Sequence, residues 1–177
     1  TAPAYSIIAL GLDNRPNELL TSFMSPITIK NTFVFDDSLS SVGAFGVDPE
    51  KLIRSEVGGY IKFAFIKKEP FNIKDISFRS NLTLFSNYIN EPQNIDVTWE
   101  TLTSLKIGKS FSLTLSTYLI YDHDIDIPRF QRDGIQPVYL QKPDGSFYLD
   151  SNGNKIQAEG PITQFKQAMG MGISLNF

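Results

Sequence analysis

Hydrophobic and polar residues alternate along most of this chain, and alternation with a period of two predicts β-strands with one apolar face. Five long segments show it, and the C-terminal stretch FKQAMGMGISLNF makes a sixth. They begin near Ile27, Val57, Ile76, Ile95, Ser110 and Phe165. Shorter segments at Tyr5 to Leu12 and Leu19 to Met24 raise the count to about eight. Because helical periodicity is hard to find, we expect an all-β, antiparallel fold.

Several of these segments are longer than the 5 to 6 residues of a usual strand in a soluble protein. Fifteen residues at about 3.3 Å each, tilted by about 45°, rise by about 35 Å, which is enough to cross a membrane. The sequence has no run of 18 consecutive apolar residues, so it predicts no transmembrane helix. The strand lengths therefore favour a transmembrane β-barrel of about eight strands, either whole or part of a larger barrel.

The predicted connections also alternate in length. Ser25-Pro26 and Gly108-Lys109 are minimal, whereas DSLSSVGAFGVDPEKLIRSE and the stretch from Ile127 to Ile162 are long. Short periplasmic turns and long extracellular loops are typical of outer-membrane barrels. With eight strands, both termini lie on the short-turn side.

The longest connection has turn signals of its own at Asp144-Gly145 and Asn152-Gly153. We therefore expect residues 127–161 to be a long extracellular loop that contains a β-hairpin. Because no linker or repeat divides the chain, residues 1–177 are predicted to be a single outer-membrane barrel domain.

Composition excludes several classes of function. The chain has 14 Phe and 7 Tyr, residues that favour strands, but one His and no Cys, so a typical zinc site or a thiolate nucleophile cannot be assembled. The net charge is -3 and no long basic run occurs, which argues against nucleic acid as a partner. No cofactor is predicted.

Three stretches carry a family resemblance: Ser25 to Lys51, Asn94 to Ile125 and Gln164 to Phe177. They resemble the C-terminal part of a Bacteroidetes-type outer-membrane β-barrel family of unknown function. The resemblance implies a Gram-negative outer membrane and barrel architecture, with lipid and other outer-membrane or periplasmic proteins as partners. It implies no catalytic residue and no ligand.

The densest polar cluster is YDHDID. Asp122, His123 and Asp124 are candidates for a hydrolase site at the extracellular rim, in which carboxylates and an imidazole activate water. Asp122, Asp124 and Asp126 share a strand face and are candidate Ca²⁺ ligands through their carboxylate oxygens. The simpler interpretation is a solvated strand end where the chain leaves the membrane.

Charged residues on the polar parity are expected to face the lumen of the barrel. These are Lys30, Lys62, Arg79, Asp96, Glu100, Lys106 and Lys166. In a closed eight-stranded barrel such side chains fill the interior, whereas in a larger barrel they line a water-filled channel.

Aromatic residues near strand ends are expected at the membrane interfaces. These are Tyr60, Tyr88, Trp99, Tyr121 and Phe177. Phe177 ends the chain and resembles the terminal aromatic by which outer-membrane barrels are recognised for insertion.

The sequence therefore predicts an outer-membrane barrel that serves as an accessory subunit of an envelope complex or as a passive pore. A soluble lipocalin-like barrel is the main alternative, and it would place the apolar parity inside. A barrel hydrolase is the third hypothesis.

Overall fold

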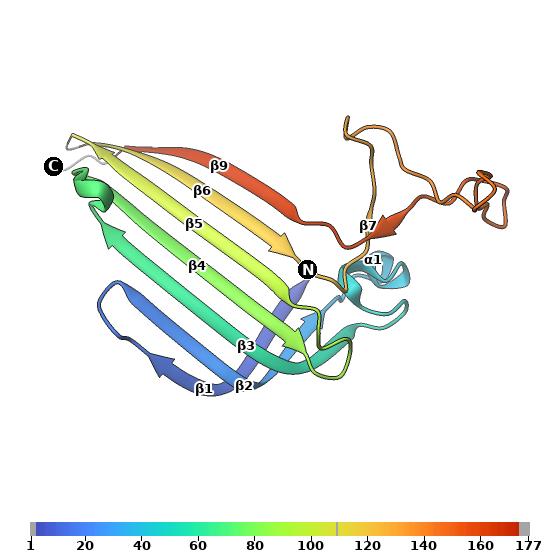
Figure 1. Ribbon diagram of the computed structural model, residues 1–177, viewed down its shortest axis with the longest axis horizontal. Helices are drawn as coiled ribbons and strands as arrows, with labels where there is room; N and C mark the ends of the chain where they lie inside the picture. The colour runs from blue at the N-terminus through green and yellow to red at the C-terminus, as the bar shows by residue number, and fades with distance from the viewer. Residues whose placement is uncertain (1–2, 109, 174–177) are drawn as a thin grey trace. The chain divides into compact units, whose positions relative to one another are not determined.

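The computed structural model describes residues 3–108 and 110–173, which form an all-β chain built around one large antiparallel sheet (Figure 1). The sheet has seven strands in the order β1-β2-β3-β4-β5-β6-β9, so its first six strands form an up-and-down meander. Their bounds are β1 Ala4–Asn14, β2 Leu20–Phe33, β3 Ile53–Lys68, β4 Ile76–Asn87, β5 Asp96–Ile107, β6 Phe111–Tyr121 and β9 Gln164–Ile173. The prediction of an all-β, antiparallel fold is confirmed.

Strand β2 runs through Ser25 and Pro26, where the sequence predicted a turn between two strands. Its pairing with β3 shifts register between Ser25 and Thr28, which marks a β-bulge. Pro26 has no N–H to give to the ladder, and a bulge is one of the few places where a strand accepts proline. Two predicted segments are therefore one strand, and the sheet has seven long strands where eight were expected.

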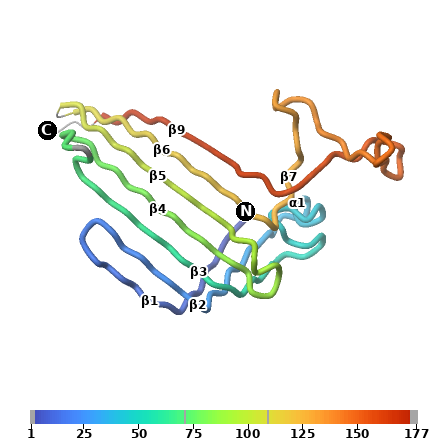
Figure 2. The backbone as a smooth tube through the Cα atoms, in the orientation of Figure 1, coloured from blue at the N-terminus to red at the C-terminus, as the bar shows by residue number. Residues whose placement is uncertain are grey.

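The connections alternate in length from one end of the sheet to the other (Figure 2). Residues 15–19 and 69–75 join strands at one end, which we call the short-turn end. Gly108 follows β5 at the same end, and Lys109 of the predicted turn lies outside the described residues. Residues 34–52, 88–95 and 122–163 join strands at the other, the long-connection end. The connection at residues 69–75 contains the 3-10 helix η2 (Pro70–Asn72). The connection at residues 34–52 contains α1 (Asp37–Ser41) and η1 (Ala44–Gly46).

The odd number of strands corrects a further expectation. Ala4 pairs with Phe33, so β1 begins at the long-connection end. Ile173 pairs with Phe111, so β9 reaches the short-turn end. The start of β1 and the end of β9 therefore lie at opposite ends of the sheet, not on the same side.

The register divides the sheet into two faces, because Cα partners in an antiparallel pair point to the same side. The apolar face carries large exposed side chains such as Leu10, at 74% exposure, and Met171, at 75%. Others on it include Ile8, Met24, Ile27, Ile29, Trp99, Ile107, Phe111, Leu115, Phe165 and Met169.

The opposite, polar face holds most of the buried residues of the sheet. Thr28, Glu56 and Phe85 are 0%, 2% and 5% exposed. Gly58 lies under the Phe85 ring, and a Cβ at Gly58 would stand 2.0 Å from the Ser86 carbonyl oxygen. The strands thus bury their polar side and expose their apolar side.

Residues 123–162 form a second compact unit. In it β7 (Ile127–Pro128) pairs with β8 (Glu159–Gly160), and isolated bridges continue the antiparallel pairing. Gly145 and Gly153 have positive φ, so both predicted turns are present. This region is therefore a unit in its own right, where the sequence predicted a loop at 127–161 within one domain.

Among residues 3–108 and 110–173, no helix is both long enough and apolar enough to cross a membrane.

Candidate functional site

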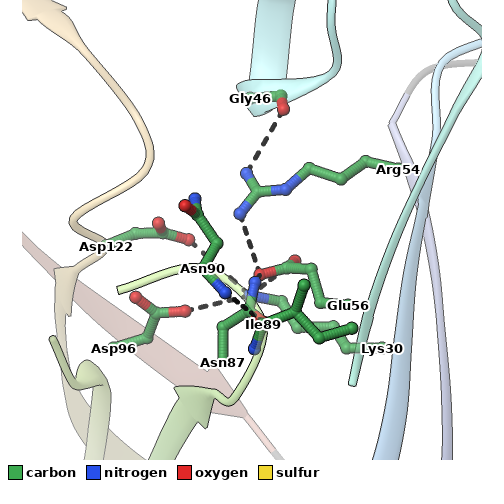
Figure 3. Close-up of polar contacts among 9 residues, drawn as sticks. All are labelled: Lys30, Gly46, Arg54, Glu56, Asn87, Ile89, Asn90, Asp96 and Asp122. Carbon is green, nitrogen blue, oxygen red and sulfur yellow. Dashed lines mark hydrogen bonds and ion pairs between the residues drawn. The ribbon is translucent and has the colours of Figure 1, made fainter. Parts of the chain in front are cut away.

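A cluster of charged side chains lies on the polar face near the long-connection end (Figure 3). Lys30 is at its centre: Nζ lies 3.1 Å from Asp96 Oδ2, 3.4 Å from Glu56 Oε2 and 3.7 Å from Asp122 Oδ2. The same Nζ stands 4.9 Å from the centroid of the Phe85 ring, within range of a cation–π contact. We call Lys30, Arg54, Glu56, Asp96 and Asp122 the charge cluster.

These contacts require a strongly curved sheet. Lys30 is on β2 and Asp96 begins β5, so two strands lie between them. In a flat sheet the backbones would stand about 14 Å apart, since neighbouring strands are about 4.8 Å apart. Asp122 follows β6, one strand further along. The polar face is therefore the concave face, and the charge cluster lies inside the curve.

Glu56 is the most buried carboxylate of the cluster. Arg54 Nη2 donates to its Oε1 at 2.8 Å, and Arg54 Nη1 donates to the Gly46 carbonyl at 3.3 Å. Asn87 Nδ2 also reaches Glu56 Oε1, at 3.5 Å. Arg54 thus ties the connection between β2 and β3 to the cluster, while Lys30 supplies the positive charge beside Oε2.

The structure places all seven predicted lumen residues on this one face. The register traces Lys62, Arg79, Glu100, Lys106 and Lys166 to the same side of the sheet as Lys30 and Asp96. The polar parity was therefore read correctly from alternation. That this face lines a lumen stays a prediction.

A cavity of about 530 Å³ lies against the concave face. Arg79, Glu100 and Lys166 contribute to its wall, together with Asn81, Ser116 and Tyr118. Two cations and one carboxylate therefore line a wall that also includes the apolar side chains of Leu102 and Ala168. Sequence reasoning found its charged members but not its Tyr118, because that residue blurs the alternation of its strand.

The YDHDID stretch is divided between the two units. Asp122 belongs to the sheet unit and pairs with Lys30, whereas His123 and Asp124 belong to the second unit. In the described part of the chain no three His, Asp or Glu side chains are grouped so that they could hold a metal ion. Asp122, Asp124 and Asp126 are therefore not grouped as Ca²⁺ ligands among the described residues. That Asp122, His123 and Asp124 form a hydrolase site stays a prediction.

The predicted interface aromatics do not all share a face. Trp99 and Tyr121 are on the apolar face, where Trp99 Nε1 donates to Ser80 Oγ at 2.9 Å. Tyr88 follows β4 and is exposed. Tyr60 is a correction: it shares the concave face with Lys62 and its ring packs against Phe23, with centroids 6.2 Å apart. Phe177 lies outside the described residues.

A second group of aromatics at the opposite end of the apolar face was not predicted. Phe65 and Phe78 pack with ring centroids 6.3 Å apart, and Phe111 begins β6 at 50% exposure. Each lies within three residues of the short-turn end of its strand. The apolar face thus has aromatic residues toward both ends, and between them aliphatic residues lie on either side of a polar row of Ser80, Thr101, Thr117 and Gln167.

In the second unit, aspartates close the turns. Ile135 and Gln136 donate backbone N–H groups to Asp133 at 2.9 and 3.0 Å, which holds the pKa of that carboxyl below its usual value. Hydrogen bonds from Ser146 lower the pKa of Asp144, and those from Asn154 lower that of Asp150. These carboxylates stabilise turns of the second unit.

No protein-family model, curated protein or solved structure matches this chain. The resemblance to a Bacteroidetes-type barrel family therefore stays an expectation from the sequence. What can be said of function rests on the two faces of the sheet.

Proposed function

We propose that this chain is an outer-membrane β-barrel protein whose apolar face meets lipid and whose concave face forms a largely filled interior, so that it acts as a structural or accessory subunit of the cell envelope. The observation that carries this proposal is the inverted arrangement of the sheet. Large aliphatic side chains are exposed on the convex side, while Lys30, Glu56 and Asp96 are held on the concave side. A soluble protein of this size is expected to do the opposite.

The dimensions of the apolar face support a membrane location. Strand β6 spans 11 residues from Phe111 to Tyr121, with an aromatic residue at each end. At about 3.3 Å per residue and a tilt of about 45°, it rises by about 25 Å. That is close to the height of the apolar band in outer-membrane barrels, which aromatic girdles border on both sides.

The charge cluster supports a filled interior over an open channel. Its three carboxylates and two cations connect β2, β3, β5 and the end of β6 across the concave face. Small barrels fill their interior with side chains in this way.

A passive pore is the second candidate, and the cavity of about 530 Å³ favours it. Arg79, Glu100 and Lys166 would then bias the selectivity of the passage. The lipocalin-like alternative fits less well, because it requires the apolar parity on the concave side, where the charge cluster lies.

Detergent phase partition tests the membrane proposal. The purified chain is expected to enter the detergent phase. A monomer that stays in the aqueous phase would refute it. Planar-bilayer recording then separates the two candidates, because a filled interior predicts no stable conductance and a pore predicts unitary steps.

A further inference from the structure

The two edge strands of the sheet have backbone edges that no other strand covers in the described part of the chain. β1 pairs only with β2 and β9 pairs only with β6. All ten residues of β9 are exposed, including Lys166, Ala168 and Gly170, whose parity is the concave one. On β1, Tyr5 and Ile7 are also concave in parity, yet they are 62% and 51% exposed.

Open edges are incompatible with a lipid environment. Each unpaired N–H and C=O in the hydrocarbon region costs several kcal/mol, so membrane-spanning sheets are closed. If the proposed function is correct, something must lie between β9 and β1.

Strand direction limits what that element can be. Six antiparallel steps separate β1 from β9, so both run from the long-connection end to the short-turn end. Direct closure of β9 on β1 would be a parallel pairing, and a second copy placed head to tail would also set β9 parallel to β1. Single-chain bacterial barrels are antiparallel with an even strand number, so an odd number of strands is missing.

The curvature sets that number at one. Lys30 on β2 contacts Asp122 at the end of β6, four strands away in the sheet order. In a closed barrel of eight strands, positions four apart lie directly opposite, and the interior is only wide enough for side chains. A much wider barrel would not let these two side chains meet.

We propose that the sheet is completed by one amphipathic β-strand from outside these 177 residues, which lies between β9 and β1 and runs antiparallel to both. This inference rests on the proposed function. The strand has about 9–11 residues and apolar side chains at alternate positions toward lipid. Its inward side chains are large beside Ala168, Gly170 and Gly172, because these three residues add little side-chain volume to the concave side of β9 beyond Lys166.

The test adds strands to the 177-residue chain. A copy of Phe111–Tyr121, the sequence that already pairs with β9, is placed before Thr1 through an Asn-Gly turn, so that it runs antiparallel to both edges. A matched control carries two such copies. Its outermost added strand then runs parallel to β9, so the sheet cannot close with antiparallel pairing. The unextended chain is the reference. We expect a folded, heat-modifiable band that resists protease only, or much more strongly, in the one-strand variant.

Because the chain has no Cys, disulfides report the closure directly. Thr101→Cys with Thr117→Cys is the positive control for a folded sheet, since the two hydroxyls are 2.7 Å apart across β5 and β6. Ile8→Cys combined with Met169→Cys or Met171→Cys tests direct closure. We expect the control disulfide in every chain, no β1–β9 disulfide in the unextended chain, and a disulfide between Met169→Cys and a cysteine in the added strand.

A β1–β9 disulfide in the unextended chain would overturn the inference, as would equal stability of the one-strand and two-strand variants. Both results leave the membrane proposal intact if the chains still enter detergent. Failure to enter detergent while the Thr101/Thr117 disulfide forms would instead overturn the proposed function.

Discussion

Lys30 on β2 and Asp96 on β5 form an ion pair 3.1 Å long, although two strands separate them in the sheet. The pair exists because the sheet curves until its polar side chains meet inside. Partly buried charges of this kind depend on one another, since each loses hydration that only its partners replace.

Replacing Lys30 by Met should destabilise the protein by about 3–5 kcal/mol, because Glu56, Asp96 and Asp122 would lose their shared cation. The measurement is the free energy of unfolding by urea from lipid vesicles. Lys62→Met is the matched control: it is on the same face but exposed, and its effect should stay within about 0.5 kcal/mol. Equal effects of the two variants would mean that the cluster does not stabilise the fold.

Gly58→Ala should cost about 1–3 kcal/mol, because the added Cβ meets the backbone carbonyl of Ser86 and the Phe85 ring. Gly170→Ala is the comparison, since its nearest neighbour is the movable hydroxyl of Thr114 at 2.9 Å. Unfolding midpoints of the two variants check this. A tolerated Gly58→Ala would show that β3 and β4 do not approach as closely as the structure has them.

Leu115→Arg should cost about 2–4 kcal/mol of folding free energy in lipid vesicles, because it places a charge near the middle of the apolar face. Ser116→Arg puts the same side chain on the next residue, where it faces the cavity on the concave side beside Glu100, and should cost much less. The opposite order of the two effects would mean that the concave face, not the convex face, contacts lipid.

The turns of the second unit should loosen in acid. The pKa of Asp133 is lowered in the folded state, so its stabilising contribution is complete above the unfolded value of about 3.9 and is lost as the pH falls through the lower folded pKa. Amide chemical shifts of Ile135 and Gln136, recorded from pH 6 to pH 2, report this loss. Asp133→Asn keeps an acceptor oxygen but cannot titrate, so the acid-dependent shift of these two amides should disappear.

Alternation predicted most of the long strands and the face to which their charged residues belong. Lys62 and Lys166 were placed on one face because a period of two fixes parity along a strand, and the register confirms it. The same rule failed at Ser25-Pro26. Proline there resembles a turn signal, whereas the bulge that accepts it depends on the register of β3, which is far away in sequence.

The charge cluster could be predicted only in part. Lys30 and Asp96 were both recognised as inward-facing, but a sequence does not contain the curvature that brings β2 to β5. Tyr60 was predicted at a membrane interface for a related reason. It lies in the middle of β3, and its distance from the ends of the sheet follows from its pairing with Phe85, which the sequence does not show.

Among residues 3–108 and 110–173, strand β9 pairs with β6 alone, through ten paired residues from Phe111↔Ile173 to Ile120↔Gln164, and in the sequence the 123–162 unit comes between these two strands. The covalent link between them is therefore long and passes through exposed turns such as that at Gly145. A chain cut there would yield two fragments that share the ladder between β6 and β9 and the pairing of β7 with β8. The protein is thus a natural candidate for fragment complementation, with its last strand delivered as a separate peptide.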